Sequence, residues 1–266
     1  MSLKCKLQNK ELTFGSWITI GHPSIAEILA YSGFEWLTID MEHSAITLSE
    51  AQNLIQVIEL AGVIPLVRVS SDNPNLIKRV MDAGAHGVIV PQVNTAKQAH
   101  AVVKSVKYPP VGERGVGLGR AQGYGLHFEG YKYWNAHDSV VIVQIENILG
   151  VQNVEEIISV EGVDGFIVGP YDLSASLGIP GEFENEEYLD VIRYLHSVIT
   201  KEKTISAGFH VVPLDPNQVH EKIAEGYTFI AYSLDSLFLA EYSRKDLNII
   251  KKESKVFDKY IKRSKI

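Results

Sequence analysis

Apolar residues gather in short runs that recur along the chain. The runs cover residues 16–21, 36–41, 64–69, 87–92, 140–146, 165–169, 205–211 and 229–235. Most of them are apolar throughout rather than alternating, which is typical of strands covered on both faces, as in a parallel sheet. The segments between the runs, such as 47–62, place apolar residues three and four positions apart and end at a glycine, which indicates helices.

The order of these elements predicts the fold class. Roughly eight strands alternate with helices over about 250 residues, the pattern and size of a (β/α)₈ barrel. We therefore predict an α/β protein built as a single (β/α)₈ TIM barrel over residues 15–240, with an additional C-terminal helical segment at 241–266. A doubly wound sheet is the competing architecture, but it usually has fewer strands, and no stretch resembles a domain linker.

Composition narrows the expected partners. The net charge of −7 argues against a general affinity for nucleic acid or for an anionic membrane surface. Cys5 is the only cysteine, so no intrachain disulfide is possible, and a reducing cytoplasm is the expected location. The N-terminal residues lack the apolar core of a signal peptide, and no apolar run is long enough to cross a bilayer.

The C-terminal residues differ in charge from the rest of the chain. Residues 251–266 carry seven basic and two acidic side chains, and Val256, Phe257, Tyr260 and Ile261 fall on one helical stripe. We expect a solvated final helix that docks on the body or on a neighbouring subunit. A membrane surface or an anionic partner is the alternative.

Polar and titratable residues stand where several of the predicted strands end. They are Asp40, Glu42, His43, Arg68, Gln92, Gln144, Glu146, Asp172, His210 and Asp235. Each alone has an ordinary explanation, as a helix cap, an ion-pair partner or a solvated loop residue. In a (β/α)₈ barrel, however, the carboxyl ends of all strands meet in one mouth, where catalytic groups project. Their joint occurrence favours a shared pocket.

The residue types indicate the chemistry of that pocket. Glu146 and Asp172 are hard oxygen ligands without accompanying cysteines or clustered histidines, a set that suits Mg²⁺, Mn²⁺ or Co²⁺ rather than a closed zinc site. Arg68 carries a planar cation that binds a carboxylate or an enolate oxygen, and His43 suits proton transfer near neutral pH. The set describes proton abstraction beside a carbonyl. A Schiff-base route is disfavoured, because no lysine ends a strand.

One connection is unusually long. Residues 108–139 are rich in glycine and aromatic residues, and a segment of this length inside a compact domain is usually functional or disordered. Its sequence GVGLG does not link a strand to a helix in the pattern of a nucleotide-binding loop. We expect instead a loop that covers the substrate, from which Arg120 either binds an acidic or hydroxylated aldehyde or remains solvated.

Three stretches together carry a family resemblance. GSWITIGHPSIAEILAYSGFEWLTIDMEHS (15–44), VVIVQIEN (140–147) and VEGVDGFIVGPYDLSASLG (160–178) closely resemble the HpcH/HpaI aldolase family of metal-dependent class II pyruvate aldolases. The resemblance extends over residues 15–239. It implies cleavage of a 4-hydroxy-2-oxo acid to pyruvate and an aldehyde. The family includes 4-hydroxy-2-oxoheptanedioate and 2-dehydro-3-deoxyglucarate aldolases.

The resemblance also implies a role for individual residues. It places the metal ligands on Glu146 and Asp172 with Gln144 close to the metal, the base on His43, and the cation that steadies the pyruvyl oxygens on Arg68. An aspartate associated with the histidine falls on Asp82, although Asp40 is nearer in sequence. The backbone of Gly169, Pro170 and Tyr171 would hold the pyruvate carboxylate. Family members are homo-oligomers, which implies a trimer or hexamer here.

Two departures from the family pattern concern substrate choice. Tyr171 occupies the third position of GPYDL, where familiar members usually have a small residue. The segment RGVGLGRAQGYG keeps its first residues and an Arg-Ala pair but differs afterwards, where aldehyde recognition is expected. The aldehyde is therefore the least determined part of the prediction. One alternative function is an acyl-CoA lyase or another pyruvate- or oxaloacetate-enolate enzyme of the same superfamily. The other is a metal-binding or scaffold barrel that has lost catalytic activity.

Overall fold

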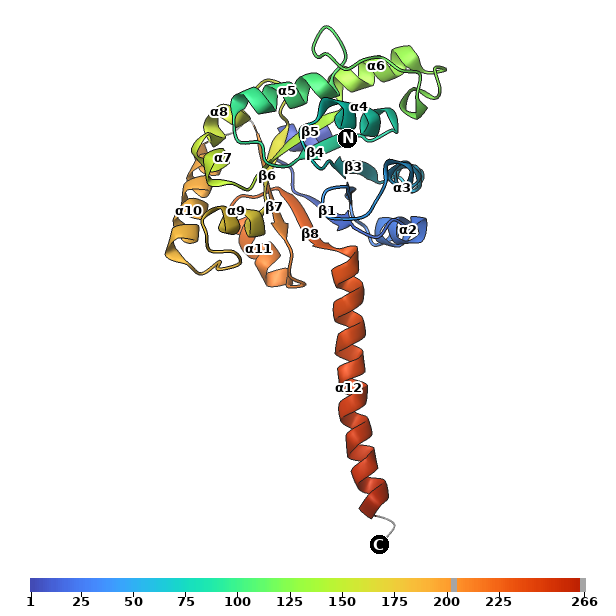
Figure 1. Cartoon of the computed structure of the whole chain (residues 1–266), viewed down its shortest axis with the longest axis vertical. Helices are drawn as coiled ribbons and strands as arrows, with labels where there is room; N and C mark the ends of the chain where they lie inside the picture. The colour runs from blue at the N-terminus through green and yellow to red at the C-terminus, as the bar shows by residue number, and fades with distance from the viewer. Residues whose placement is uncertain (202–204, 264–266) are drawn as a thin grey trace.

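Eight parallel strands hydrogen-bond in sequence order and close into a barrel, which confirms the predicted fold (Figure 1). The structure is a computed structural model that describes residues 1–201 and 205–263, with side chains described up to residue 253. The strands are β1 (Thr13–Ile18), β2 (Trp36–Asp40), β3 (Ile64–Arg68), β4 (Gly87–Val90), β5 (Val140–Ile145), β6 (Gly165–Val168), β7 (Ser206–Val211) and β8 (Phe229–Leu234).

Strand β1 is the one whose position differs most from the prediction. It begins at Thr13, which pairs with Phe229 of β8, and it ends at Ile18 rather than at residue 21. The backbone turns away after Ile18 because the carboxylate of Asp235 accepts hydrogen bonds from the amides of Thr19 at 2.9 Å and Ile20 at 2.8 Å. An acidic side chain thus replaces the neighbouring strand as the hydrogen-bond acceptor.

Helices surround the barrel and connect successive strands. They are α2 (Pro23–Tyr31), α3 (Leu48–Leu60), α4 (Pro74–Asp82), α5 (Ala96–Val106), α6 (Phe128–His137), α7 (Ile148–Gln152), α8 (Val154–Ile158), α9 (Pro170–Ser176), α10 (Glu186–Lys201) and α11 (Pro216–Ala224). Local sequence signals determine where several of these helices begin. In α3, Thr47 and Glu50 form a reciprocal capping box at the start of the helix.

The apolar residues divide into two clusters according to the side of the strands on which they lie. Alternate residues such as Ile39, Val67 and Val143 pack outward against the helices in one large cluster. The others point into the barrel, where Trp36 stacks on Phe229 with ring centroids 4.0 Å apart. Gly15 permits this stacking, because an added Cβ would lie 2.1 Å from the indole of Trp36. The same alternation carries polar residues inward near the strand ends.

The two chain ends add helices that the eight repeating units do not contain. Helix α1 (Leu3–Gln8) buries Leu3 and Leu7 against the inward cluster and so closes the end of the barrel where strands begin. Helix α12 (Asp235–Arg263) continues directly from β8 and projects far from the barrel (Figure 1). The C-terminal helical segment therefore begins at residue 235, earlier than predicted, and the stripe at 256–261 lies beyond the described side chains. Among the described residues, no helix combines the length and hydropathy of a membrane span.

Candidate active site

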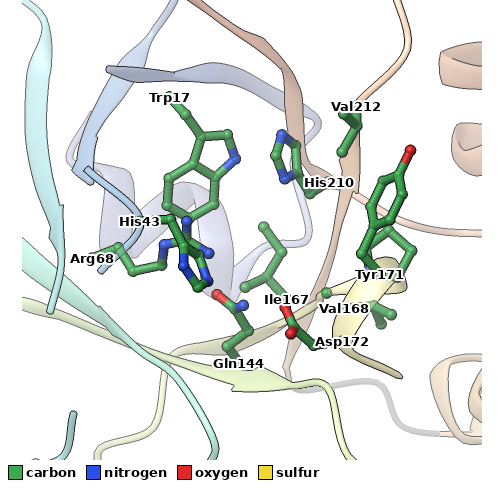
Figure 2. A pocket seen from close by; sticks show the side chains of 12 residues that line it. Trp17, His43, Arg68, Gln144, Ile167, Val168, Tyr171, Asp172, His210 and Val212 are labelled. Atoms are coloured by element: carbon green, nitrogen blue, oxygen red, sulfur yellow. The ribbon is translucent and has the colours of Figure 1, made fainter. Parts of the chain in front are cut away.

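A cavity of about 160 Å³ lies at the mouth of the barrel, where the strands end (Figure 2). The residues that line it are Trp17, His43, Arg68, Gln144, Ile167, Val168, Gly169, Pro170, Tyr171, Asp172, His210 and Val212. They come from the ends of β1, β2, β3, β5, β6 and β7. Five of the ten residues that were expected to share a pocket line this cavity, namely His43, Arg68, Gln144, Asp172 and His210.

Arg68 and Asp40 form a buried, two-pronged ion pair at one wall of the cavity. Arg68 Nε donates to Asp40 Oδ1 at 2.9 Å and Nη2 donates to Oδ2 at 2.7 Å. The guanidinium carbon lies 4.4 Å from the ring centroid of Trp17. Asp40 is 2% exposed, and although burial opposes its ionisation, Arg68 and two backbone amides hold its pKa below the usual value. The pair therefore fixes a permanent cation whose Nη1 has no hydrogen-bond partner among the described residues.

His43 lies on the loop that follows β2, beside Glu42. Its Nε2 is 3.7 Å from Glu42 Oε2, and its side chain is 58% exposed. Asp40 Oδ1 accepts hydrogen bonds from the backbone amides of Glu42 at 3.0 Å and His43 at 3.1 Å, so Asp40 shapes this loop rather than pairing with the imidazole. Within one chain, the carboxylate nearest the His43 ring is Glu42. Glu42 was expected at the strand end, but its sequence position alone indicated no specific role.

Glu146 lies behind the cavity, almost completely buried. Its Oε1 accepts a hydrogen bond from the Gln92 amide at 2.8 Å, and Oε2 accepts one from Gln144 Nε2. An added Cβ on Gly169 would stand 2.8 Å from Glu146 Oε2 and 3.0 Å from Gln144 Nε2. Only glycine therefore allows the chain after β6 to approach this carboxylate so closely. Gln144 Oε1 is buried without a partner in the described part of the chain.

Helix α9 supplies the opposite wall. It begins at Pro170 with Gly169 as its N-cap, no side chain caps it, and Asp172 lies in its first turn. Free backbone amides at a helix start favour an anionic group nearby. Tyr171 is 50% exposed, and its ring meets Phe183 edge-on at 5.0 Å between centroids, so it stands over the rim rather than filling the cavity.

Two carboxylates beside the cavity, those of Glu146 and Glu42, have a raised pKa. Burial raises the pKa of Glu146 to about 7, and the negative charges of Glu42 and Asp172 add to the effect. Burial likewise raises the pKa of Glu42 to about 7, with Asp40 and Asp172 contributing and Arg68 opposing. Glu146 has no cationic partner among the described residues, and Gln144 adds an unused oxygen. An oxygen-only donor set of this kind fits a hard divalent cation. Among the described residues, no three His, Cys, Asp or Glu form a complete metal cage.

Trp17, His210 and Val212 are lining residues to which the sequence analysis gave no role. Trp17 is the inward residue of β1, and His210 is the inward residue near the end of β7. Their rings lie 5.2 Å apart between centroids. His210 was noted as a strand-end residue, but Trp17 resembles any core tryptophan in sequence. The inward alternation of β1, counted from Gly15, would have identified it.

Asp82 and Arg120 do not reach the cavity of their own chain. Both belong to the opposite end of the barrel, because α4 ends at Asp82 just before β4 begins, and residues 107–139 lead from α5 into β5. Arg120 bonds to Glu59 and donates to the Ala83 carbonyl at 3.2 Å, whereas Asp82 lies 3.9 Å from Arg114 Nε. The long segment, with η1 (Arg120–Gln122) and α6, therefore does not cover the cavity of its own chain, contrary to expectation.

Known proteins with similar sequences and structures give the family. The model of the HpcH/HpaI aldolase/citrate lyase family matches residues 13–241. The chain is 38% identical over 231 residues to 2-dehydro-3,6-dideoxy-6-sulfogluconate aldolase of Pseudomonas putida, covering 86% of this chain and 89% of the relative. It is 34% identical over 246 residues to 2-keto-3-deoxy-L-rhamnonate aldolase of Klebsiella pneumoniae, covering 92% and 91%.

A solved structure agrees with these relatives. The crystal structure of an HpcH/HpaI aldolase/citrate lyase family protein from Burkholderia cenocepacia J2315 matches with a TM-score of 0.88 and 32% identity, covering 94% of this chain and 98% of that one. A closed (β/α)₈ barrel with an arginine, an imidazole and several carboxylates where its strands end has the arrangement typical of enzymes with this fold. The chain belongs to the HpcH/HpaI aldolase/citrate lyase family, as its motifs predicted. It is accordingly an aldolase, a carbon–carbon lyase.

Proposed function

We propose that the protein cleaves a 4-hydroxy-2-oxo acid, such as a 2-keto-3-deoxy sugar acid, to pyruvate and an aldehyde, and catalyses the reverse addition. The observation that carries this proposal is the convergence of Arg68, Gln144 and Asp172 on one small cavity, with His43 at its mouth. The two aldolase relatives are named for 2-oxo acid substrates, which agrees with it.

The chain's own residues account for binding and proton movement. Arg68, held in place by Asp40, presents its free Nη1 to the C2 oxygen of the substrate. The start of α9 at Gly169, Pro170 and Tyr171 receives the C1 carboxylate. During cleavage the C3–C4 bond breaks, and its electrons move toward the C2 oxygen. The C4 hydroxyl proton passes to the His43 imidazole, and a proton added at C3 completes pyruvate.

Glu146 and Asp172 would hold a divalent cation, Mg²⁺, Mn²⁺ or Co²⁺, with Gln144 beside it. When bound, such a cation supplies Lewis-acid polarisation of the C2 carbonyl and stabilises the negative charge that develops there. The buried carboxylate of Glu146 and the unpartnered Gln144 oxygen support this assignment. Glu42, 3.7 Å from His43 Nε2, stabilises the protonated imidazole.

The role that the resemblance implies for Asp82, and an aldehyde-binding role for Arg120, would each require a second copy of the chain. Both residues lie at the end of the barrel opposite their own cavity, so neither acts there. A homo-oligomer, trimer or hexamer, in which this end of one subunit meets the mouth of its neighbour would bring them to a cavity. Asp82 Oδ1 is buried 3.9 Å from Arg114 Nε, but the Asp82 side chain as a whole is 26% exposed and therefore accessible to such a contact.

Exchange of the pyruvate methyl protons in D₂O tests the proposal without knowledge of the aldehyde. The purified protein is stripped with a chelator, reloaded with Mg²⁺, Mn²⁺ or Co²⁺, and followed by proton NMR. We expect exchange in the loaded protein and its loss after chelation, together with pyruvate release from a panel of 2-keto-3-deoxy acids. Absence of both activities contradicts the proposal. Turnover of a CoA thioester without pyruvate exchange identifies an acyl-CoA lyase instead.

A further inference from the structure

One wall of the cavity contains a hydrogen-bond donor that no described residue uses. Trp17 is 2% exposed, lines the cavity, and its Nε1 has no hydrogen-bond partner among the described residues. Buried indole N–H groups usually find a partner, because leaving one unpaired is unfavourable. In Figure 2 the nitrogen of Trp17 lies on the side of its ring that faces His210. The donor is therefore directed at the space beside that imidazole.

His210 supplies the complementary acceptor. Its Nε2 lies 3.3 Å from the Ser233 carbonyl, which can only accept, so Nε2 carries the proton. Burial and the nearby Arg68 cation lower the pKa of His210 to about 3, against the favourable hydrogen bond to Ser233, so the ring is neutral. In a neutral ring with its proton on Nε2, Nδ1 is an acceptor. Within the described residues no donor bonds to it.

The backbone next to His210 is held in an uncommon conformation. Ser233 has a φ of 52°, in the left-handed region that non-glycine residues rarely adopt. Its carbonyl accepts from His210 Nε2, and Ser16 Oγ also donates to this carbonyl at 3.4 Å. Strained backbone of this kind persists where the surrounding structure fixes it, often at ligand sites. The tautomer and orientation of His210 are thus set by the fold rather than by solvent.

We propose that Trp17 Nε1 and His210 Nδ1 together select a hydroxyl group on the aldehyde portion of the substrate, at the carbon next to the reacting carbonyl. A hydroxyl both donates and accepts, so it satisfies the two groups at once, whereas a methyl group of similar size satisfies neither. Figure 2 places both rings across the cavity from Gln144 and Asp172, where the pyruvyl half binds under the proposed function on which this inference rests.

A matched pair of aldehydes tests the selection. With pyruvate as the donor, kcat/KM for aldol addition is measured for 2-hydroxypropanal and for 2-methylpropanal, which differ only by hydroxyl against methyl. Because the two aldehydes differ in intrinsic reactivity, we compare the ratio of their two kcat/KM values, hydroxylated over methylated, between the wild-type enzyme and each variant. The ratio does not depend on the active fraction of a preparation. We expect the wild type to favour the hydroxylated aldehyde by at least about tenfold.

Two variants remove the two groups independently. His210→Leu removes the acceptor, and Trp17→Phe removes the donor while keeping an aromatic ring beneath Arg68. We expect each to lower the ratio about tenfold or more, because each leaves the hydroxyl with one partner missing. His196→Leu makes the same change at an exposed position on α10 and controls for the substitution itself.

Every outcome bears on the inference. A lower kcat/KM ratio in each variant that folds supports the inference. An unchanged ratio in either folded variant overturns it. The inference is also overturned if the wild type exchanges pyruvate protons but shows no preference for the hydroxylated aldehyde. The same holds if the wild type exchanges pyruvate protons but turns over neither aldehyde. Failure of pyruvate exchange in the wild type would instead remove the proposed function, so the two failures are distinguishable.

Discussion

Replacing Arg68 with lysine separates the geometry of the active-site cation from its charge. The guanidinium makes two hydrogen bonds with Asp40, from Nε at 2.9 Å and Nη2 at 2.7 Å, and its plane lies over Trp17. Lysine retains one positive charge but has a single nitrogen, so it cannot bond both Asp40 oxygens and face the substrate at the same time. We therefore expect Arg68→Lys to impair both stability and activity.

The structure sets the size of each effect. A hydrogen bond to a charged group contributes about 1.5–3 kcal/mol, and a cation over an aromatic face about 0.5–1 kcal/mol. Losing one of the two Asp40 bonds and the stacking over Trp17 should lower the free energy of unfolding by about 2–4 kcal/mol. Losing the donor aimed at the developing C2 oxyanion should lower kcat by about 10²–10³ fold.

Denaturant unfolding and pyruvate exchange in D₂O measure the two effects separately. Arg193→Lys is the matched control, because Arg193 also contacts two carboxylates, those of Glu186 and Asp190, but on the exposed surface. It should change the free energy of unfolding by less than about 1 kcal/mol and leave exchange unaltered. If Arg68→Lys exchanged pyruvate protons at the wild-type rate, the proposed role of the guanidinium fork would be wrong.

Four further substitutions test other assignments. Glu146→Ala or Asp172→Ala should abolish both metal binding, measured by calorimetry, and pyruvate exchange, and retained affinity would exclude them as ligands. His43→Ala should bind metal normally but exchange protons about 10²–10⁴ fold more slowly, and metal loss would show a misassigned base. His86 and Arg120 lower the pKa of Glu59 to about 2, so its contribution to stability is complete above about pH 5 and is lost as the pH falls towards 2. Glu59→Gln should flatten this part of the stability–pH curve, and an unchanged curve would contradict the assignment.

The barrel was predictable because its strands are buried on both faces. Continuous apolar runs located all eight strands, and seven of them begin and end within two residues of the predicted bounds. Strand β1 was the exception, because the feature that ends it is a side chain far away in sequence. Asp235 takes the amides of Thr19 and Ile20, and no local pattern around Ile18 reveals this.

The polar residues at and behind the cavity were predictable as strand-end residues, since polar residues at the end of an apolar strand are conspicuous. Arg68, Gln144 and Glu146 stand out in this way. Trp17 did not, because inside a barrel an aromatic residue that packs and one that lines a cavity have the same sequence pattern. What distinguishes Trp17 is an unpaired Nε1, a property of three-dimensional surroundings alone.

The prediction that the long segment at 108–139 covers the cavity was wrong, because its length and composition do not show at which end of the barrel it lies. A connection from a helix to the next strand must lie at the end of the barrel where strands begin, whatever its composition. This segment leads from α5 into β5, so chain order alone excludes it from the cavity of its own subunit. Its fixed contacts at that end, Arg120 with Glu59 and the Ala83 carbonyl, also argue against a hinged lid. This segment could therefore contribute to catalysis only at the cavity of a neighbouring subunit, while it remains folded against its own barrel.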